Sequence, residues 1–75
     1  MEQRIMEIIK EIVPQGGFDE STALVDDGIL DSMAIASLIS ELSLEYDIRI
    51  PYDDISEENF NSVSAIATLV KRLQK

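Results

Sequence analysis

The sequence contains neither cysteine nor histidine. Without cysteine, no disulfide or thiolate metal site can stabilise the fold. Without histidine, the chain lacks the commonest general base and the commonest metal ligand. At 75 residues it has room for one domain at most. We therefore expect neither a self-sufficient hydrolase nor a zinc module, and no catalytic residues or metal site.

Basic and aromatic side chains are also scarce. Lys and Arg number 6 against 15 Asp and Glu, which gives a formal net charge of −9. Such a surface repels nucleic-acid phosphates and anionic lipids, so the expected partners are proteins with basic patches. Aromatic residues make up 5% of a chain that is 45% hydrophobic, which predicts an aliphatic core.

Long apolar runs are missing as well. The N-terminal stretch MEQRIMEIIKEIV is charged throughout its first half, unlike the apolar core of a signal peptide. No apolar run approaches the roughly 18 residues of a membrane span. We therefore expect a cytoplasmic protein without membrane insertion.

Three segments have the apolar period of an amphipathic helix. The first is expected from about Glu2 to Val13, because Pro14 pushes the residue before it out of the helical region. The second is expected from an N-cap at Asp31 to about Tyr46. The third begins after Asn61 or Ser62. The apolar stripes of the three segments are Ile5, Ile8, Ile9 and Ile12; Ile35, Leu38, Ile39, Leu42 and Tyr46; and Val63, Ile66, Ala67, Leu69, Val70 and Leu73.

The remaining segments show no sustained period. Residues 14–30 are expected to form an ordered crossing loop, held to the helices by Phe18, Leu24 and Ile29. Residues 47–51 are expected to form an extended link with Ile48 and Ile50 turned inward. A short helix is predicted next, capped by Asp53 or Asp54, carrying Ile55 and ending near Phe60. The predicted fold is all-α: a small four-helix bundle, with three long helices and one short, and a long loop between the first two.

Candidate chemistry centres on the residues before and at the start of the second helix. Asp26, Asp27 and Asp31 do not have the spacing of an EF-hand calcium loop, and nothing indicates a pocket for acid–base catalysis. Ser32 is not a nucleophile elbow, because it lacks flanking glycines and there is no histidine to activate it. A serine in the first helical turn does lie beside free backbone N–H groups and the positive end of the helix dipole. A phosphate ester on Ser32 would therefore be favourably placed, although simple capping also explains an Asp-Ser pair.

Three stretches resemble the carrier protein family that binds phosphopantetheine. DDGILDSMAI (Asp26 to Ile35) resembles the attachment site, with its Asp-Ser-Met triplet at the start of the second helix. EYDIRIP (Glu45 to Pro51) resembles the junction after that helix, and NFNSVSAI (Asn59 to Ile66) resembles the entry to the last helix. The resemblance covers nearly the whole chain, in order, and implies a single carrier domain over residues 1–75 with an acyl-carrier-like bundle.

The resemblance also implies a function. Ser32 would receive 4′-phosphopantetheine from coenzyme A through a separate, Mg²⁺-dependent phosphopantetheinyl transferase, with Asp31 as the preceding acid of the motif. The thiol of the arm would then hold an acyl or aminoacyl group as a thioester. The expected partners are this transferase, adenylating or other acyl-loading enzymes, and acyltransferases or synthases. The carrier itself would catalyse nothing, and we expect a monomer.

The exposed face of the second helix differs from that of fatty-acid carriers, in which the family pattern is strongly acidic. Opposite its apolar stripe lie Met33, Ser37, Ser40 and Leu44, with Glu41 to one side. We expect this face to dock partner enzymes through Met33 and Leu44. It looks more like that of D-alanyl carriers and stand-alone peptidyl carriers, which favours a specialised acyl or aminoacyl carrier over the fatty-acid type. The resemblance leaves the pathway open among fatty acid, polyketide, nonribosomal peptide and D-alanylation. The alternative is an acidic helical adaptor with Ser32 unmodified.

Overall fold

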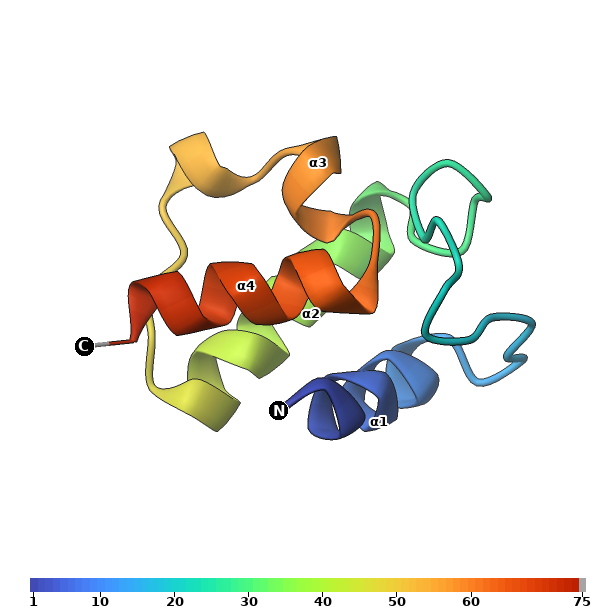
Figure 1. The fold of residues 1–75 in the computed structure, drawn as a ribbon, viewed down its shortest axis with the longest axis horizontal. Coiled ribbons are helices and arrows are strands. Elements are labelled where there is room, and N and C mark those ends of the chain that lie inside the picture. Colours follow the sequence, from blue (N-terminus) through green and yellow to red (C-terminus); the bar gives the residue numbers. More distant parts are fainter. Residues whose placement is uncertain (75) are drawn as a thin grey trace.

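The structure, a computed structural model, describes residues 1–74, and every regular element in this range is a helix (Figure 1). The all-α prediction, with three long helices and a short one, is confirmed. In chain order the elements are α1 (Glu2–Ile12), α2 (Ser32–Tyr46), a 3₁₀ turn η1 (Tyr52–Asp54), α3 (Glu57–Phe60) and α4 (Val63–Leu73).

The three long helices lie side by side around one core. α1 contacts both α2 and α4, and α3 contacts α4. α2 and α4 run in the same general direction, while α1 runs against them (Figure 1). The start of α2, the start of α4 and the end of α1 therefore lie at one end of the bundle, where the long loop crosses. The other end holds the end of α2, the end of α4 and the N-terminus.

The core is aliphatic apart from one ring, as the composition predicts. Its fully buried side chains come from all three long helices, from the long loop and from α3, whose Phe60 has no exposed surface. The predicted stripes of α1 and α4 supply most of it. The stripe of α2 is only half buried, since Leu38 and Leu42 are enclosed while Ile35 and Ile39 lie partly exposed.

The long loop is ordered and attached to the core, as expected. Leu24 is fully buried, and Phe18 and Ile29 pack against the core. Leu30 is also buried, a contact that the sequence did not predict. In the link after α2, Ile50 is buried and Ile48 is partly buried, in agreement with their expected inward positions.

Two boundaries differ from the prediction. α1 ends at Ile12, with Val13 as its C-cap. The segment expected as one short helix capped by Asp53 or Asp54 is two elements, because those aspartates belong to η1 and the N-cap of α3 is Ser56. The Ser56 side chain accepts a hydrogen bond from the Asn59 N–H at 3.3 Å. Ile55 lies between the two elements and is 38% exposed.

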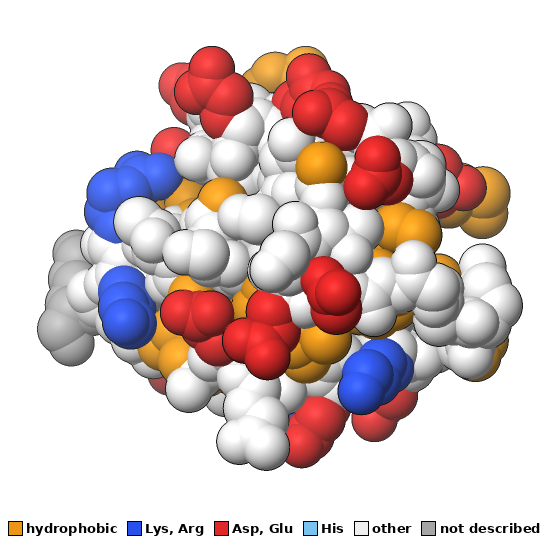
Figure 2. Space-filling model, turned by 45° about the vertical axis from the view of Figure 1, so that its right-hand side comes forward, with side chains coloured by type: hydrophobic (Ala, Val, Ile, Leu, Met, Phe, Trp, Pro, Cys, Tyr) orange, Lys and Arg blue, Asp and Glu red, His pale blue; other side chains and the backbone are white. Residues whose placement is uncertain are grey.

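Charge is unevenly spread over the surface. Acidic side chains recur over most of the face in Figure 2, whereas basic ones gather at its left edge and at one lower position. Three ion pairs are formed in the described part of the chain. Arg4 binds Glu7 and Glu45 at 3.0 Å each, which joins α1 to α2, and Arg72 binds Asp54 at 3.1 Å. No helix within residues 1–74 has the length and apolar character needed to cross a bilayer.

Candidate functional site

Ser32 is the first residue of α2, and its side chain is exposed. The residue before it, Asp31, has an extended backbone and accepts a hydrogen bond from the Ala34 N–H at 2.8 Å. Its carbonyl accepts the Ile35 N–H at 2.9 Å. The predicted N-cap is therefore confirmed, and Asp31 fixes the turn from which Ser32 projects.

The start of α2 favours an anionic group electrostatically. As the first two helical residues, Ser32 and Met33 have backbone N–H groups without an intrahelical acceptor. The 15-residue helix adds the positive end of its dipole at the same place. No acidic residue lies in the first turn of α2 to oppose a second anion, although the capping Asp31 lies just before it. A phosphate ester on the Ser32 hydroxyl would meet these N–H groups.

The face of α2 expected to dock partners is exposed along its whole length. Met33 and Leu44, near its two ends, are each 81% exposed. Ser37, Ser40 and Glu41 between them are exposed as well. The structure thus places the five residues on one open surface beside Ser32, while their contact with a partner stays a prediction.

Asn61 is a residue whose role the sequence did not reveal. The sequence predicts Asn61 or Ser62 as the cap of the last helix, and the structure shows that the cap is Ser62, whose hydroxyl accepts the Ala65 N–H at 3.0 Å. The Asn61 side chain instead reaches the long loop and accepts the N–H groups of Val25 and Asp26. No local periodicity could have predicted a contact between residues 36 positions apart.

Asp26 and Glu57 form a pair of facing carboxyl groups where the loop meets α3. A hydrogen bond from Glu57, with a second from Asn61, lowers the pKa of Asp26. The same contact with Asp26 raises the pKa of Glu57, and repulsion from the Asp26 charge raises it further. Between the two pKa values, Glu57 therefore keeps the proton and donates it to the Asp26 carboxylate.

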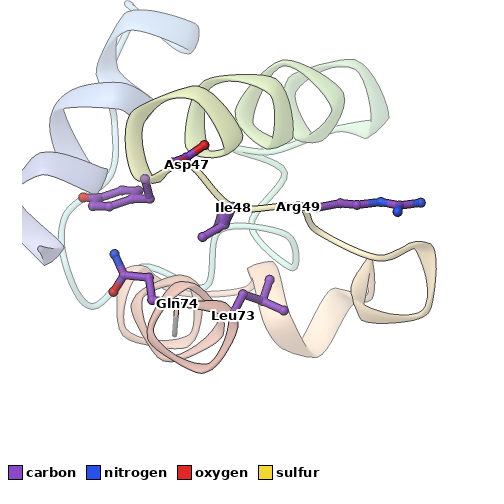
Figure 3. A pocket seen from close by; sticks show the side chains of 6 residues that line it. Asp47, Ile48, Arg49, Leu73 and Gln74 are labelled. Atoms are coloured by element: carbon purple, nitrogen blue, oxygen red, sulfur yellow. The ribbon is translucent and has the colours of Figure 1, made fainter.

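Two hollows lie near the two ends of α2. A small groove of about 260 Å³ adjoins Ser32, between the end of α1 and the start of α2, and includes Val13, Gln15, Ile29, Asp31 and Met33 in its walls. A larger open hollow of about 730 Å³ lies at the far end of α2, against the end of α4 (Figure 3). There the Arg49 side chain extends away from Leu73 and Gln74. The larger hollow is therefore separated from Ser32 by the length of α2.

Comparison with known proteins identifies the family. The family model described as phosphopantetheine attachment site matches residues 3–70. The chain belongs to this family of carrier proteins. Among curated relatives, the D-alanyl carrier protein of Streptococcus sanguinis strain SK36 is 34% identical over 71 residues, which is 93% of this chain and 90% of that protein. That of Lactococcus lactis subsp. cremoris strain MG1363 is 36% identical over 73 residues, or 95% and 92%.

The family implies a 4′-phosphopantetheine prosthetic group, and the residues at the start of α2 fit it. An exposed hydroxyl, free first-turn N–H groups and a capped, ordered helix start meet the needs of a phosphodiester on a serine. The group supplies a thiol, which this chain lacks because it has no cysteine. The carrier function, in which acyl or aminoacyl groups are held as a thioester on such an arm, follows from family membership.

Proposed function

We propose that this chain is an aminoacyl carrier whose phosphopantetheine arm is attached to Ser32 and whose cargo is D-alanine. The observation that carries the proposal is the exposed Ser32 at the capped start of α2, inside the segment matched by the family model. In this proposal Asp31 is a positioning residue. It holds the first turn of α2 through the Ala34 N–H, so that the serine hydroxyl meets the transferase in one orientation.

The proposed cargo rests on two independent observations. The curated relatives named above are D-alanyl carrier proteins, and alignment with them covers more than nine-tenths of this chain. The exposed face of α2 carries serines and two large apolar side chains, with Glu41 as its acid, in contrast to the acidic face expected of fatty-acid carriers. An adenylating enzyme that activates D-alanine is therefore the proposed loading partner.

The proposed docking surface is the open face of α2 defined by Met33, Ser37, Ser40, Glu41 and Leu44. Its two apolar ends suit an interface in which large side chains enter pockets of the partner. The small serines between them let a partner surface approach the helix closely. In the proposal the phosphopantetheinyl transferase and the loading enzyme use this surface in turn, and the carrier is a cytoplasmic monomer that catalyses no step itself.

Intact-mass spectrometry tests the attachment site. The protein is incubated with coenzyme A, Mg²⁺ and a broad-specificity phosphopantetheinyl transferase. We expect the wild type to gain one phosphopantetheine, Ser32→Ala to gain none, and Ser64→Ala, which changes an exposed serine of α4 outside the docking surface, to be modified like the wild type. Ser32→Ala should keep its helical circular dichroism, because Asp31 still caps α2. A wild type without mass gain would contradict the carrier proposal, and modification of Ser32→Ala would show that the site is wrong.

A loading assay tests the cargo. The modified carrier is offered D-alanine, L-alanine or a fatty acid, each with an adenylating enzyme that activates it, and the thioester is measured by mass. We expect loading with D-alanine by a D-alanine-activating enzyme to be the fastest. Faster loading with a fatty acid would refute the proposed cargo and leave the attachment site at Ser32 intact.

A further inference from the structure

The long loop before Ser32 is held at one point by Asn61, a residue far along the chain at the junction between α3 and α4. The Asn61 Oδ1 accepts the Val25 N–H at 2.8 Å and the Asp26 N–H at 3.0 Å. The Asn61 Nδ2 donates to the Asp26 Oδ2 at 3.1 Å. The Asn61 carbonyl accepts the Leu24 N–H at 2.8 Å. Three consecutive loop residues are thus bound by one asparagine.

The same part of the loop is closed on itself up to the cap of α2. The Leu30 N–H donates to the Leu24 carbonyl at 2.9 Å, so the two ends of the segment 24–30 meet. Within it, the Gly28 N–H donates to the Val25 carbonyl at 3.0 Å, and the Asp27 N–H donates to the carbonyl of Ala23, the residue just before the segment, at 2.8 Å. Leu30 directly precedes Asp31. The Asn61 side chain therefore fixes the hydrogen-bonded segment 24–30, and this segment in turn positions Asp31, which caps α2.

Asn61 itself has little freedom to move. It lies between Phe60, the last residue of α3, and Ser62, the cap of α4. Phe60 and Val63, on either side of this junction, have no exposed surface. The asparagine is therefore anchored in the core at its backbone and holds the loop with its side chain. An amide suits this position because it accepts from two N–H groups and also donates to a carboxylate.

We propose that Asn61 is a positioning residue for Ser32, which fixes the loop that delivers the start of α2 to partner enzymes. The proposal rests on Ser32 being the attachment site. Without the Asn61 side chain, the segment 24–30 would be ordered for only a fraction of the time. A partner that requires the ordered form then binds with an apparent affinity reduced by that fraction, while the bound complex reacts as before.

The test combines hydrogen exchange with transferase kinetics on the whole chain. Asn61→Ala is compared with Asn59→Ala, a matched control that removes the hydrogen bond from the Asn59 Nδ2 to the Asp54 carbonyl at 2.8 Å and leaves the loop untouched. In Asn61→Ala we expect the Val25 and Asp26 amides to exchange roughly fivefold faster or more. We expect the KM of the transferase for the carrier to rise by about threefold to tenfold with kcat within about twofold. Asn59→Ala should change neither.

Exchanging the side chains of Asn61 and Asp26 provides a rescue experiment for the KM. Asn61→Asp keeps the acceptor for the two N–H groups but faces the Asp26 carboxylate with a second negative charge, so the KM should rise. Adding Asp26→Asn restores a donor–acceptor pair with its direction reversed, and the KM should return towards the wild-type value. A KM for Asn61→Ala equal to that of the wild type, or an equal rise in Asn59→Ala, would overturn the positioning role alone. A wild type that is not modified at all would overturn the carrier proposal and this one with it.

Discussion

The capping residue Asp31 holds the start of α2 through a single side-chain hydrogen bond, to the Ala34 N–H at 2.8 Å. Removing an aspartate cap commonly lowers the free energy of unfolding by about 1 kcal/mol. We therefore expect Asp31→Ala to be about 1 kcal/mol less stable in urea denaturation. Asp27→Ala is the matched control, because it removes the same charge from an exposed loop residue whose side chain caps no helix. Equal losses in the two variants would show that charge, and not capping, is the cause.

Glu57 is a second residue whose effect on stability can be tested, because contact with the Asp26 carboxyl raises its pKa. The lowered pKa of Asp26 gives a stabilising contribution that is lost as pH falls through that pKa. The raised pKa of Glu57 has the opposite effect: its stabilising contribution is present at low pH and is lost as pH rises through that pKa. Above both pKa values the two carboxylates are ionised and repel each other. Glutamine at position 57 is uncharged and can donate to Asp26 at every pH.

We therefore expect Glu57→Gln to raise the melting temperature at neutral pH. The gain should shrink as pH is lowered into the range where the wild-type Glu57 takes up its proton. Glu58→Gln is the control, since it removes the same charge one residue away and should give a smaller gain. Thermal melts at several pH values measure the difference. A gain that is constant with pH, or that grows as pH falls, would contradict the proposed carboxyl pair.

At the scale of elements, the long helices and a short helix ending near Phe60 could be predicted from the sequence, whereas the cap of the short helix and the separate 3₁₀ turn before it could not. The stripes from Ile5 to Ile12 and from Val63 to Leu73 have the helical period, and Asp31 is a strong local capping signal, so these features agree with the structure. The region 52–60 is too short for a period to appear. Its acids Asp53 and Asp54 look like caps, yet Ser56 caps α3 because the chain makes a separate 3₁₀ turn first.

The position of Ser32 at the start of α2 and the exposure of the face beside it could be predicted for the same reason: both are local features of one periodic helix. The attachment role of Ser32 and the docking role of this face stay predictions. The groups that fix the loop were not predictable, because they depend on tertiary contacts. Asn61 meets Val25 only when the junction between α3 and α4 lies against the long loop. An asparagine beside a serine before an apolar run favours a helix cap in sequence terms, and nothing local distinguishes a cap from a residue that binds a distant loop.

The open face of α2 gives a prediction for the element as a whole. Met33 and Leu44 are the large apolar side chains of this face and are both 81% exposed. Truncating an apolar anchor at an interface commonly costs more than about 1 kcal/mol, whereas an exposed charge at the rim mainly changes the association rate. We expect Met33→Ala and Leu44→Ala to slow transfer from the loading enzyme more than Glu41→Ala does.

The competing idea is electrostatic docking through Glu41, Glu45 and the acids near α3. Transfer kinetics of each variant at low and high salt separate the two. With apolar docking, salt should weaken transfer only modestly, because few charges line the face. A steep salt dependence, with the Met33 and Leu44 variants near the wild type, would show that docking is electrostatic.

At the scale of the whole molecule, the excess of acids acts against the folded state. Fifteen acids and 6 basic residues are carried on a body that measures 33 × 22 × 20 Å. At about 0.01 M ionic strength the Debye length is roughly 30 Å, so acids repel across the whole molecule. At about 0.15 M it is roughly 8 Å, and only near neighbours still repel. Unfolding separates the charges, so repulsion lowers stability most at low salt.

The surface ion pairs stabilise the folded state, so their screening by salt lowers stability, but this effect is weaker than the relief of repulsion. Salt screens the bonds of Arg4 to Glu7 and Glu45 and of Arg72 to Asp54. These pairs lie at the surface, where each contributes about 0–1 kcal/mol. Relief of the repulsion among a net charge of −9 should exceed their loss. The sign of the salt effect on stability is therefore expected to be positive.

We predict that the urea midpoint rises as NaCl is increased from about 0.01 to 0.2 M, a range in which screening dominates over the exclusion of salts from protein surfaces. KCl at equal ionic strength should give the same curve, and an equal concentration of sucrose should not reproduce it. Arg4→Gln, which removes a cation that joins α1 to α2, should show a steeper rise, because its net charge is more negative and it has fewer ion pairs to lose. A midpoint that falls with salt would mean that the surface ion pairs outweigh the repulsion. The charge of this carrier would then stabilise its fold through local pairing instead of opposing it.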